Sequence, residues 1–260
     1  MTASLIMSNN MRKDNLRRIA IVLISTLAAF VWMLVEDKII DPVLEGRFGA
    51  TAVNLDGLFL LLPLAVAFVL SPKLRRLFPV RLTWTWVLLI PLSGVFLNLA
   101  FLAKPDGIAI GFPMASLIIG GFATGFKEEL FFRGFAFMRG GESTPRITVL
   151  VTAVCFSLMH LLHFLSGETT LLVGFDVYVA FALGLSFGVM RIATGSIAWG
   201  VLIHGAVDAT LSIADTGSRA YQISAALFMV TTFVAGFTVF FAHPAMRKTG
   251  NTNTIADAMV

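Results

Sequence analysis

Cysteine and charged residues are scarce in this chain of 260 residues. Its single cysteine, Cys155, excludes an intrachain disulfide and a metal centre built from several thiolates. Charged residues make up 13% of the chain, and hydrophobic residues make up 57%. The sequence also lacks a recognisable soluble domain, a low-complexity linker and an internal repeat. What is present is a series of long apolar runs, and a helix crosses a hydrocarbon core roughly 30 Å thick with about 20 such residues.

The apolar runs predict an all-α fold, a polytopic membrane protein with about eight transmembrane helices. Backbone groups in lipid must be hydrogen-bonded within the protein, which leaves helices and closed barrels. The runs are too long and too continuously apolar for the alternating strands of a barrel. The expected spans are 19–35, 54–71, 83–103, 109–126 with a polar continuation to 139, 147–165, 171–190, 194–214 and 221–242.

The net charge of +4 is distributed as a signal of topology and does not indicate nucleic-acid binding. Thirteen lysines and arginines fall in the termini and loops expected on one side of the membrane, and four fall on the other. Because cytoplasmic loops carry the excess of lysine and arginine, both termini are expected in the cytoplasm. The opposite side holds the longest expected loop, 36–53, and Glu36 is assigned to it. The first apolar run has no small-residue cleavage site and predicts an uncleaved helix.

Few ionisable residues lie inside the expected spans, where each is costly and is a functional candidate by default. At about 1.5 Å per residue, Glu128, His160 and His204 each lie roughly 16–21 Å from the cytoplasmic boundary. Three helices therefore bring a carboxylate and two imidazoles to one depth, which predicts a site. The other candidates are Lys127, Glu129, Arg133 and Asp208, with Asp176 nearer the outer end of its span.

Spacing on the fourth span distinguishes its charged residues. Glu129 and Arg133 are four residues apart and are expected to form a structural ion pair. Glu128 points about 100° away from that pair and stays available as a general base. Lys127 is either a cation whose side chain extends to the membrane–water interface or an ion-pair partner of Glu128.

Spacing on the fifth and seventh spans assigns the remaining polar residues. His204 and Asp208 are also four residues apart, so the carboxyl group can orient the imidazole or share a ligand with it. Phe156 precedes His160 by one helical turn and is expected to wall the site. The alternative for each histidine is a hydrogen-bonded residue of the core, and His163 is expected at the interface.

Three short motifs resemble those of a known family. The segment "EELFFR" resembles the EExxxR motif of the type II CAAX prenyl endopeptidase and bacteriocin-processing family, also called CPBP or Abi. "FSLMH" resembles its FxxxH motif, and "HGAVD" resembles its HxxxN/D motif. The resemblance covers about residues 110–215 and rests on the order and common depth of the three motifs.

The resemblance implies an intramembrane protease and a role for each motif residue. Glu128 and His160 would activate a water molecule, and His204 with Asp208 would stabilise the oxyanion. Glu129, Arg133 and Phe156 would support the site. The prenyl-protease branch generally has asparagine where this chain has Asp208, so that carboxylate is expected to orient His204.

A metal-independent mechanism without a cofactor is the expectation that the resemblance favours. Zinc is the alternative, because nitrogen and oxygen ligands suit it. Its ligands would be Glu128, His160, His204 and Asp208.

The expected organisation follows from the spans and the resemblance. The segments are a cytoplasmic N-terminal segment (1–18), N-terminal transmembrane helices (19–106), a catalytic transmembrane core (107–215), the last transmembrane helix (216–247) and a flexible cytoplasmic tail (248–260).

The expected function is hydrolysis of a peptide bond in a peptide or membrane-protein substrate, within a bacterial plasma membrane. The expected partners are therefore that substrate and the lipid bilayer, and no nucleic acid. One alternative is a non-catalytic immunity or scaffold protein with the same fold. The other is a proton-coupled transporter, which predicts paired broken helices, and the sequence shows none.

Overall fold

The computed structural model describes residues 2–48, 72, 76–78, 89, 112–135, 137, 145–167, 169–214 and 217–246. Every regular element within these ranges is helical. The expected span 54–71, all of 83–103 except Leu89, and the tail 248–260 lie outside the described residues.

Among the described residues, four helical stretches are long and apolar enough to cross a membrane. These are Ile19–Arg47, Pro145–Leu165, Thr170–Thr194 and Arg219–Ala242. They coincide with the expected first, fifth, sixth and eighth spans, and by length and composition they support a helical protein with several membrane spans. The shorter apolar helix Ala198–Ile213 coincides with the seventh.

The expected loop 36–53 is wrong as far as Phe48. Helix α1 (Thr2–Val35) runs on through a π-helical turn (Glu36–Ile40) into α2 (Asp41–Phe48). Proline is tolerated in the first turn of a helix, but its ring clashes with the carbonyl four residues earlier. The wider π turn Glu36–Ile40 contains the carbonyl four residues before Pro42, where that clash would fall. The chain therefore stays helical through this part of the expected loop.

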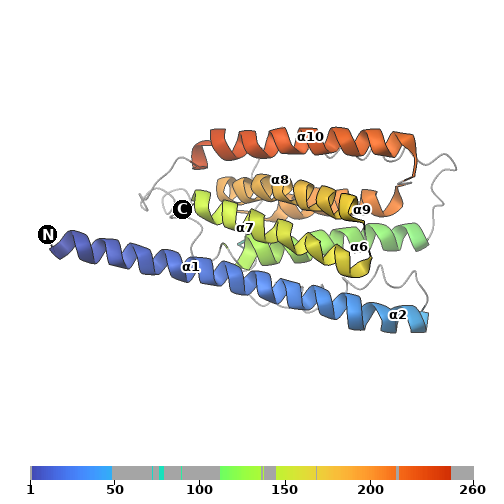
Figure 1. Ribbon diagram of the computed structural model, residues 1–260, viewed down its shortest axis with the longest axis horizontal. Coiled ribbons are helices and arrows are strands. Elements are labelled where there is room, and N and C mark those ends of the chain that lie inside the picture. Colours follow the sequence, from blue (N-terminus) through green and yellow to red (C-terminus); the bar gives the residue numbers. More distant parts are fainter. Residues whose placement is uncertain are drawn as a thin grey trace.

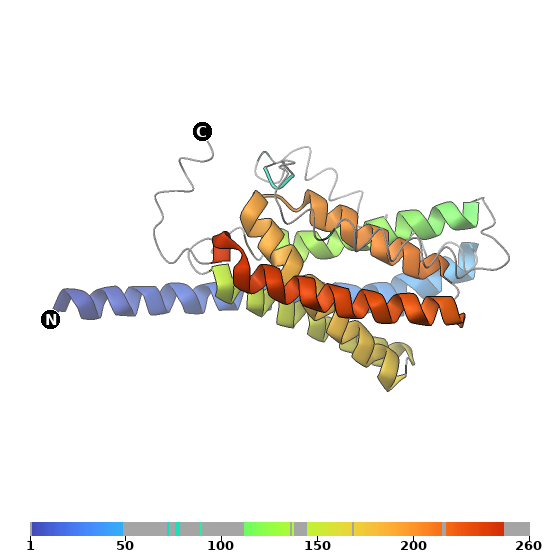
Figure 2. The same ribbon diagram turned by 90° about the horizontal axis from the view of Figure 1, so that it is seen from above.

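Five more helices follow α2 in the described part of the chain, and α1 lies along them. Helix α6 packs against α9, α7 against α8, and α8 against α10. Figure 1 shows α10 and α1 on opposite sides of the bundle, and Figure 2 shows the N-terminal part of α1 projecting beyond it. The bounds are Phe112–Glu129 for α6, Pro145–Met159 for α7, Thr170–Thr194 for α8, Ala198–Ile213 for α9 and Arg219–Ala242 for α10.

Glycine permits the close contact between α6 and α9. A Cβ atom added at Gly125 would lie 2.5 Å from the backbone nitrogen of Gly205, and one at Gly121 would lie 2.3 Å from that of Ala209. Real Cβ atoms do not approach backbone so closely, so these two helices touch backbone to backbone. The contact brings the C-terminal end of α6 against the middle of α9, where the polar motif residues lie.

Candidate active site

A buried ion pair joins the last residue of α6 to the turn that follows the helix. The Arg133 Nη1 atom donates to Glu129 Oε1 at 2.8 Å, and the two side chains are 0% and 1% exposed. Arg133 lies in the π-helical turn Leu130–Phe135 that follows α6. Single π turns inside helices are frequent at functional sites. The pairing is the one that the four-residue spacing predicts.

Aromatic rings surround the guanidinium group of Arg133. Its central carbon lies 4.4 Å from the ring centroid of Phe156, 5.6 Å from that of Phe187 and 5.8 Å from that of Phe132. Rings within about 6 Å attract a cation through their quadrupole. The Nε atom of Arg191 donates to the backbone oxygen of Arg133 at 3.0 Å and ties this turn to α8. The motif arginine is thus fixed by α7 and α8 as well as by α6.

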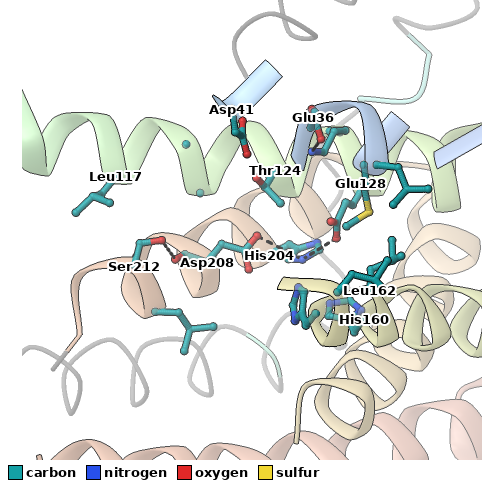
Figure 3. A pocket seen from close by; sticks show the side chains of 18 residues that line it. Glu36, Asp41, Leu117, Thr124, Glu128, His160, Leu162, His204, Asp208 and Ser212 are labelled. Carbon is teal, nitrogen blue, oxygen red and sulfur yellow. Dashed lines mark hydrogen bonds and ion pairs between the residues drawn. The ribbon is translucent and has the colours of Figure 1, made fainter. Parts of the chain in front are cut away.

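His204 lies among three carboxylates. Its Nδ1 is hydrogen-bonded to Glu129 Oε1 at 3.2 Å. Its Nε2 lies 3.6 Å from Glu128 Oε2 and 3.6 Å from Asp208 Oδ2. Figure 3 shows Asp208, His204 and Glu128 in a row along the cavity. The imidazole is therefore oriented by the hydrogen bond that Glu129 accepts from Nδ1, whereas the spacing on α9 had suggested Asp208.

Phe156 and Phe187 hold the His204 ring from two sides. The Phe156 ring meets it edge to face with centroids 5.5 Å apart, and the Phe187 ring stacks on it at 5.6 Å. Both phenylalanines are 1% exposed. No spacing or motif distinguishes Phe187 from the other phenylalanines of the chain, of which there are 24 in all.

His160 begins the 3-10 helix His160–Ser166 that continues α7. Its Nδ1 lies 3.0 Å from the backbone oxygen of Phe156. A carbonyl oxygen only accepts, so Nδ1 carries the hydrogen and Nε2 of the neutral ring is an acceptor. The Phe156 ring contacts both histidine rings, at 5.1 Å from His160 and 5.5 Å from His204. Phe156 therefore packs against both histidines of the site.

A cavity of about 480 Å³ collects the polar residues of several helices. Glu128 reaches it from α6, His160 from the end of α7, and His204 and Asp208 from α9, as Figure 3 shows. One oxygen of Asp208, Oδ2, is buried without a hydrogen-bond partner. Leucines make up much of the remaining wall: Leu34, Leu117, Leu162, Leu165 and Leu211.

The first helix also contributes to this cavity. Glu36 accepts hydrogen bonds from Lys127 Nζ and from Trp32 Nε1. Glu36 and Lys127 are 4% and 5% exposed, and both line the cavity. The assignment of Glu36 to a solvent-exposed loop is thus wrong, because α1 continues as a helix through that position. The four-residue spacing of Trp32 and Glu36 was the signal available in the sequence.

His163 and Asp176 form a second, more open pair. The His163 Nδ1 atom lies 2.9 Å from Asp176 Oδ2, and the side chains are 38% and 33% exposed. The rings of His163 and His160 lie 5.5 Å apart, centroid to centroid. His163 also lines the cavity, and Asp176 pairs with it there, whereas the sequence had suggested two separate residues near the ends of their spans.

The described ranges contain no group of three or more histidine, cysteine, aspartate or glutamate side chains that could hold a metal ion. The four residues named as zinc ligands, Glu128, His160, His204 and Asp208, line one cavity.

One comparison with known proteins gives a match. Residues 110–210 match the family model described as Rce1-like, type II CAAX prenyl endopeptidase Rce1-like. All three motifs lie inside this range, whereas α1, α2 and α10 lie outside it. No curated protein matches the chain at a significant level.

Proposed function

Since residues 110–210 belong to the Rce1-like family of type II CAAX prenyl endopeptidases, a protease family, we propose that this chain is an intramembrane endopeptidase. Its substrate is a peptide or a membrane protein. The catalytic residues are Glu128, His160, His204 and Asp208. The observation that carries the proposal is that all four line one cavity, although they come from three separate helices.

Glu128 and His160 prepare the water for attack. The Glu128 carboxylate takes a proton from the water, and the resulting hydroxide adds to the carbonyl carbon of the substrate. The unprotonated Nε2 of His160 accepts a hydrogen bond from the other O–H group of the same water, and this bond orients the water. The assignment of His160 follows from its Nδ1, which is engaged by the Phe156 carbonyl.

His204 stabilises the oxyanion of the tetrahedral intermediate. Both of its ring nitrogens face carboxylates, and only the imidazolium form donates from both. The Nε2 atom lies 3.6 Å from Glu128 and from Asp208, beyond hydrogen-bond range, so its hydrogen is available for the substrate oxygen. Asp208 balances the charge of the imidazolium. Collapse of the intermediate breaks the C–N bond, and Glu128 returns its proton to the leaving amine.

The mechanism requires no metal ion or other cofactor in this proposal. The Nδ1 atom of His204 is bonded to Glu129 and that of His160 to a carbonyl oxygen, so each histidine acts through its Nε2 atom.

The membrane arrangement proposed for the whole chain has eight spans with both termini in the cytoplasm, in a bacterial plasma membrane. The distribution of lysine and arginine supports the orientation. Four helices of sufficient length in the described part of the chain support a multi-pass arrangement.

Cleavage of a peptide library by the purified protein tests the proposal. We expect the wild type to cleave, and Glu128→Gln and His160→Ala each to lose at least about 100-fold in kcat, as removal of a general base does. Wild-type cleavage should persist with a chelator. Glu45→Gln, an exposed residue of α2, is the matched control for loss of a carboxylate.

Three results would count against the proposal. A wild type that cleaves nothing would favour the immunity or scaffold alternative. Glu128→Gln with wild-type cleavage would exclude Glu128 as the base. Loss of cleavage with the chelator would move the same residues to a metal site.

A further inference from the structure

Glu36 and Lys127 form a buried ion pair that joins α1 to α6 at the cavity. Lys127 lies in the matched range, directly before Glu128. Glu36 lies far outside the matched range and 91 residues from Lys127 in the chain. The three motifs include neither residue, and the mechanism above uses neither.

We propose that Glu36 is a positioning residue of the active site, which holds the Lys127 ammonium against α1 and so prevents it from pairing with Glu128. This inference rests on the proposed function, because it concerns the freedom of the general base. It also makes α1 part of the active site.

The position of Lys127 is what makes this restraint necessary. Lys127 and Glu128 are consecutive residues of α6, and both line the cavity. An ammonium on a flexible four-carbon stem can turn toward either carboxylate. A buried charge without a partner is costly, so the ammonium stays with whichever acid is held within reach. A Glu128 carboxylate bound by that ammonium would be a weaker base.

Glu36 is itself held in place by two further features. Its Oε1 atom accepts a hydrogen bond from Trp32 Nε1, one helical turn earlier, and its Oε2 atom faces Lys127. Helix α1 is in turn packed on the bundle, because Val22 belongs to the core cluster that includes Phe132 and Phe156, and Met33 packs against that cluster. The acceptor for Lys127 is therefore positioned by packing rather than by solvent.

A double-mutant cycle separates this inference from a simple structural contact. The variants are Glu36→Gln, Lys127→Met and the two combined, and the readouts are kcat and KM on the best-cleaved library peptide and thermal unfolding in detergent. We expect Glu36→Gln to lose about tenfold or more in kcat with KM nearly unchanged. The Lys127 ammonium would then bind Glu128 and weaken it as a base, while the substrate-binding surface stays the same. Adding Lys127→Met should recover most of that loss, since no ammonium is then left to bind Glu128.

Glu45→Gln on α2 is the control and should match the wild type in both readouts. The inference is overturned if Glu36→Gln keeps the wild-type kcat, or if the double variant is no more active than Glu36→Gln. If Glu36→Gln fails to fold, the double variant decides the question. A double variant that folds and cleaves supports the inference, and a double variant that folds without cleaving overturns it. If the double variant does not fold either, the pair is a structural contact and the inference is overturned. A wild type that cleaves nothing overturns the proposed function and this inference together.

Discussion

A single carboxylate, Glu129, connects the motif arginine to the imidazole on α9. Its Oε1 atom contacts Arg133 at 2.8 Å and His204 at 3.2 Å, so it fixes both the turn after α6 and the imidazole on α9. Its other oxygen is buried without a hydrogen-bond partner. A carboxylate in this position holds the site together without touching the substrate.

Replacing Glu129 with glutamine should destabilise the protein strongly. The change leaves the Arg133 guanidinium buried with no carboxylate on it, and such losses cost about 3–5 kcal/mol. Denaturant unfolding in detergent measures the difference, with the exposed Glu45→Gln as the control, which should stay within about 0.5 kcal/mol of the wild type. Equal stability of the two variants would show that the pair is not a structural element.

The residues of the site differ in how far the sequence could predict them. Glu129 and Arg133 lie four apart on one helix, and their pairing follows from local geometry. The contact of Glu129 with His204 joins residues 75 apart, and the contact of Glu36 with Lys127 joins residues 91 apart. Such contacts depend on how the helices pack, which no local spacing determines. The motifs identified the candidate residues, but they did not predict which carboxylate pairs with which basic side chain.

At the scale of helices, the close packing of α6 on α9 determines the geometry of the site. Gly125 precedes Glu128 by three residues, and Gly205 follows His204 directly. Because the backbones touch at these two glycines, any separation of the helices moves the carboxylate away from the imidazole.

Gly125→Ala should therefore lower both stability and activity. Its new Cβ atom would meet the backbone of α9, and overpacking of this kind costs about 1–3 kcal/mol. Gly174→Ala in α8 is the matched control, because nothing lies within 4 Å of the added atom. That control should gain up to about 1 kcal/mol from the removal of a helical glycine. Thermal unfolding and cleavage rates of both variants give the comparison, and a Gly125→Ala variant as active and stable as Gly174→Ala would contradict the account.

The sequence predicted the apolar helices well and their irregular turns poorly. Hydropathy located the stretches that became α1, α7, α8 and α10, because burial in lipid demands long apolar helices. It placed a loop at 36–53, where the first apolar run ends. The π turn Glu36–Ile40 keeps the chain helical there and places Glu36 at the cavity. The π turn Leu130–Phe135 places Arg133 against Glu129.

At the scale of the whole molecule, the site extends beyond the matched range. Helices α6, α7 and α9 supply the proposed catalytic residues, and α1 with the π turn after it supplies a further wall with Met33, Leu34 and Glu36. The cavity is therefore formed by the first helix together with elements of the matched range.

The proposed topology places the N-terminus and the loop before α10 on opposite sides of the membrane. In a Cys155→Ser background, Asn10→Cys should react with a membrane-impermeant thiol reagent only in inside-out vesicles. Thr216→Cys should react only in right-side-out vesicles, since seven spans are proposed between them. Labelling of both positions from the same side would rule out this arrangement.

The central claim is that this protein hydrolyses peptide bonds with Glu128 as the base, and cleavage in water enriched in oxygen-18 tests it most directly. The account predicts that mass spectrometry finds wild-type products with one heavy oxygen in the new carboxyl group, and that Glu128→Gln yields no such product under the same conditions. Products of the wild type without the heavy oxygen, or labelled products from Glu128→Gln at the wild-type rate, would contradict it.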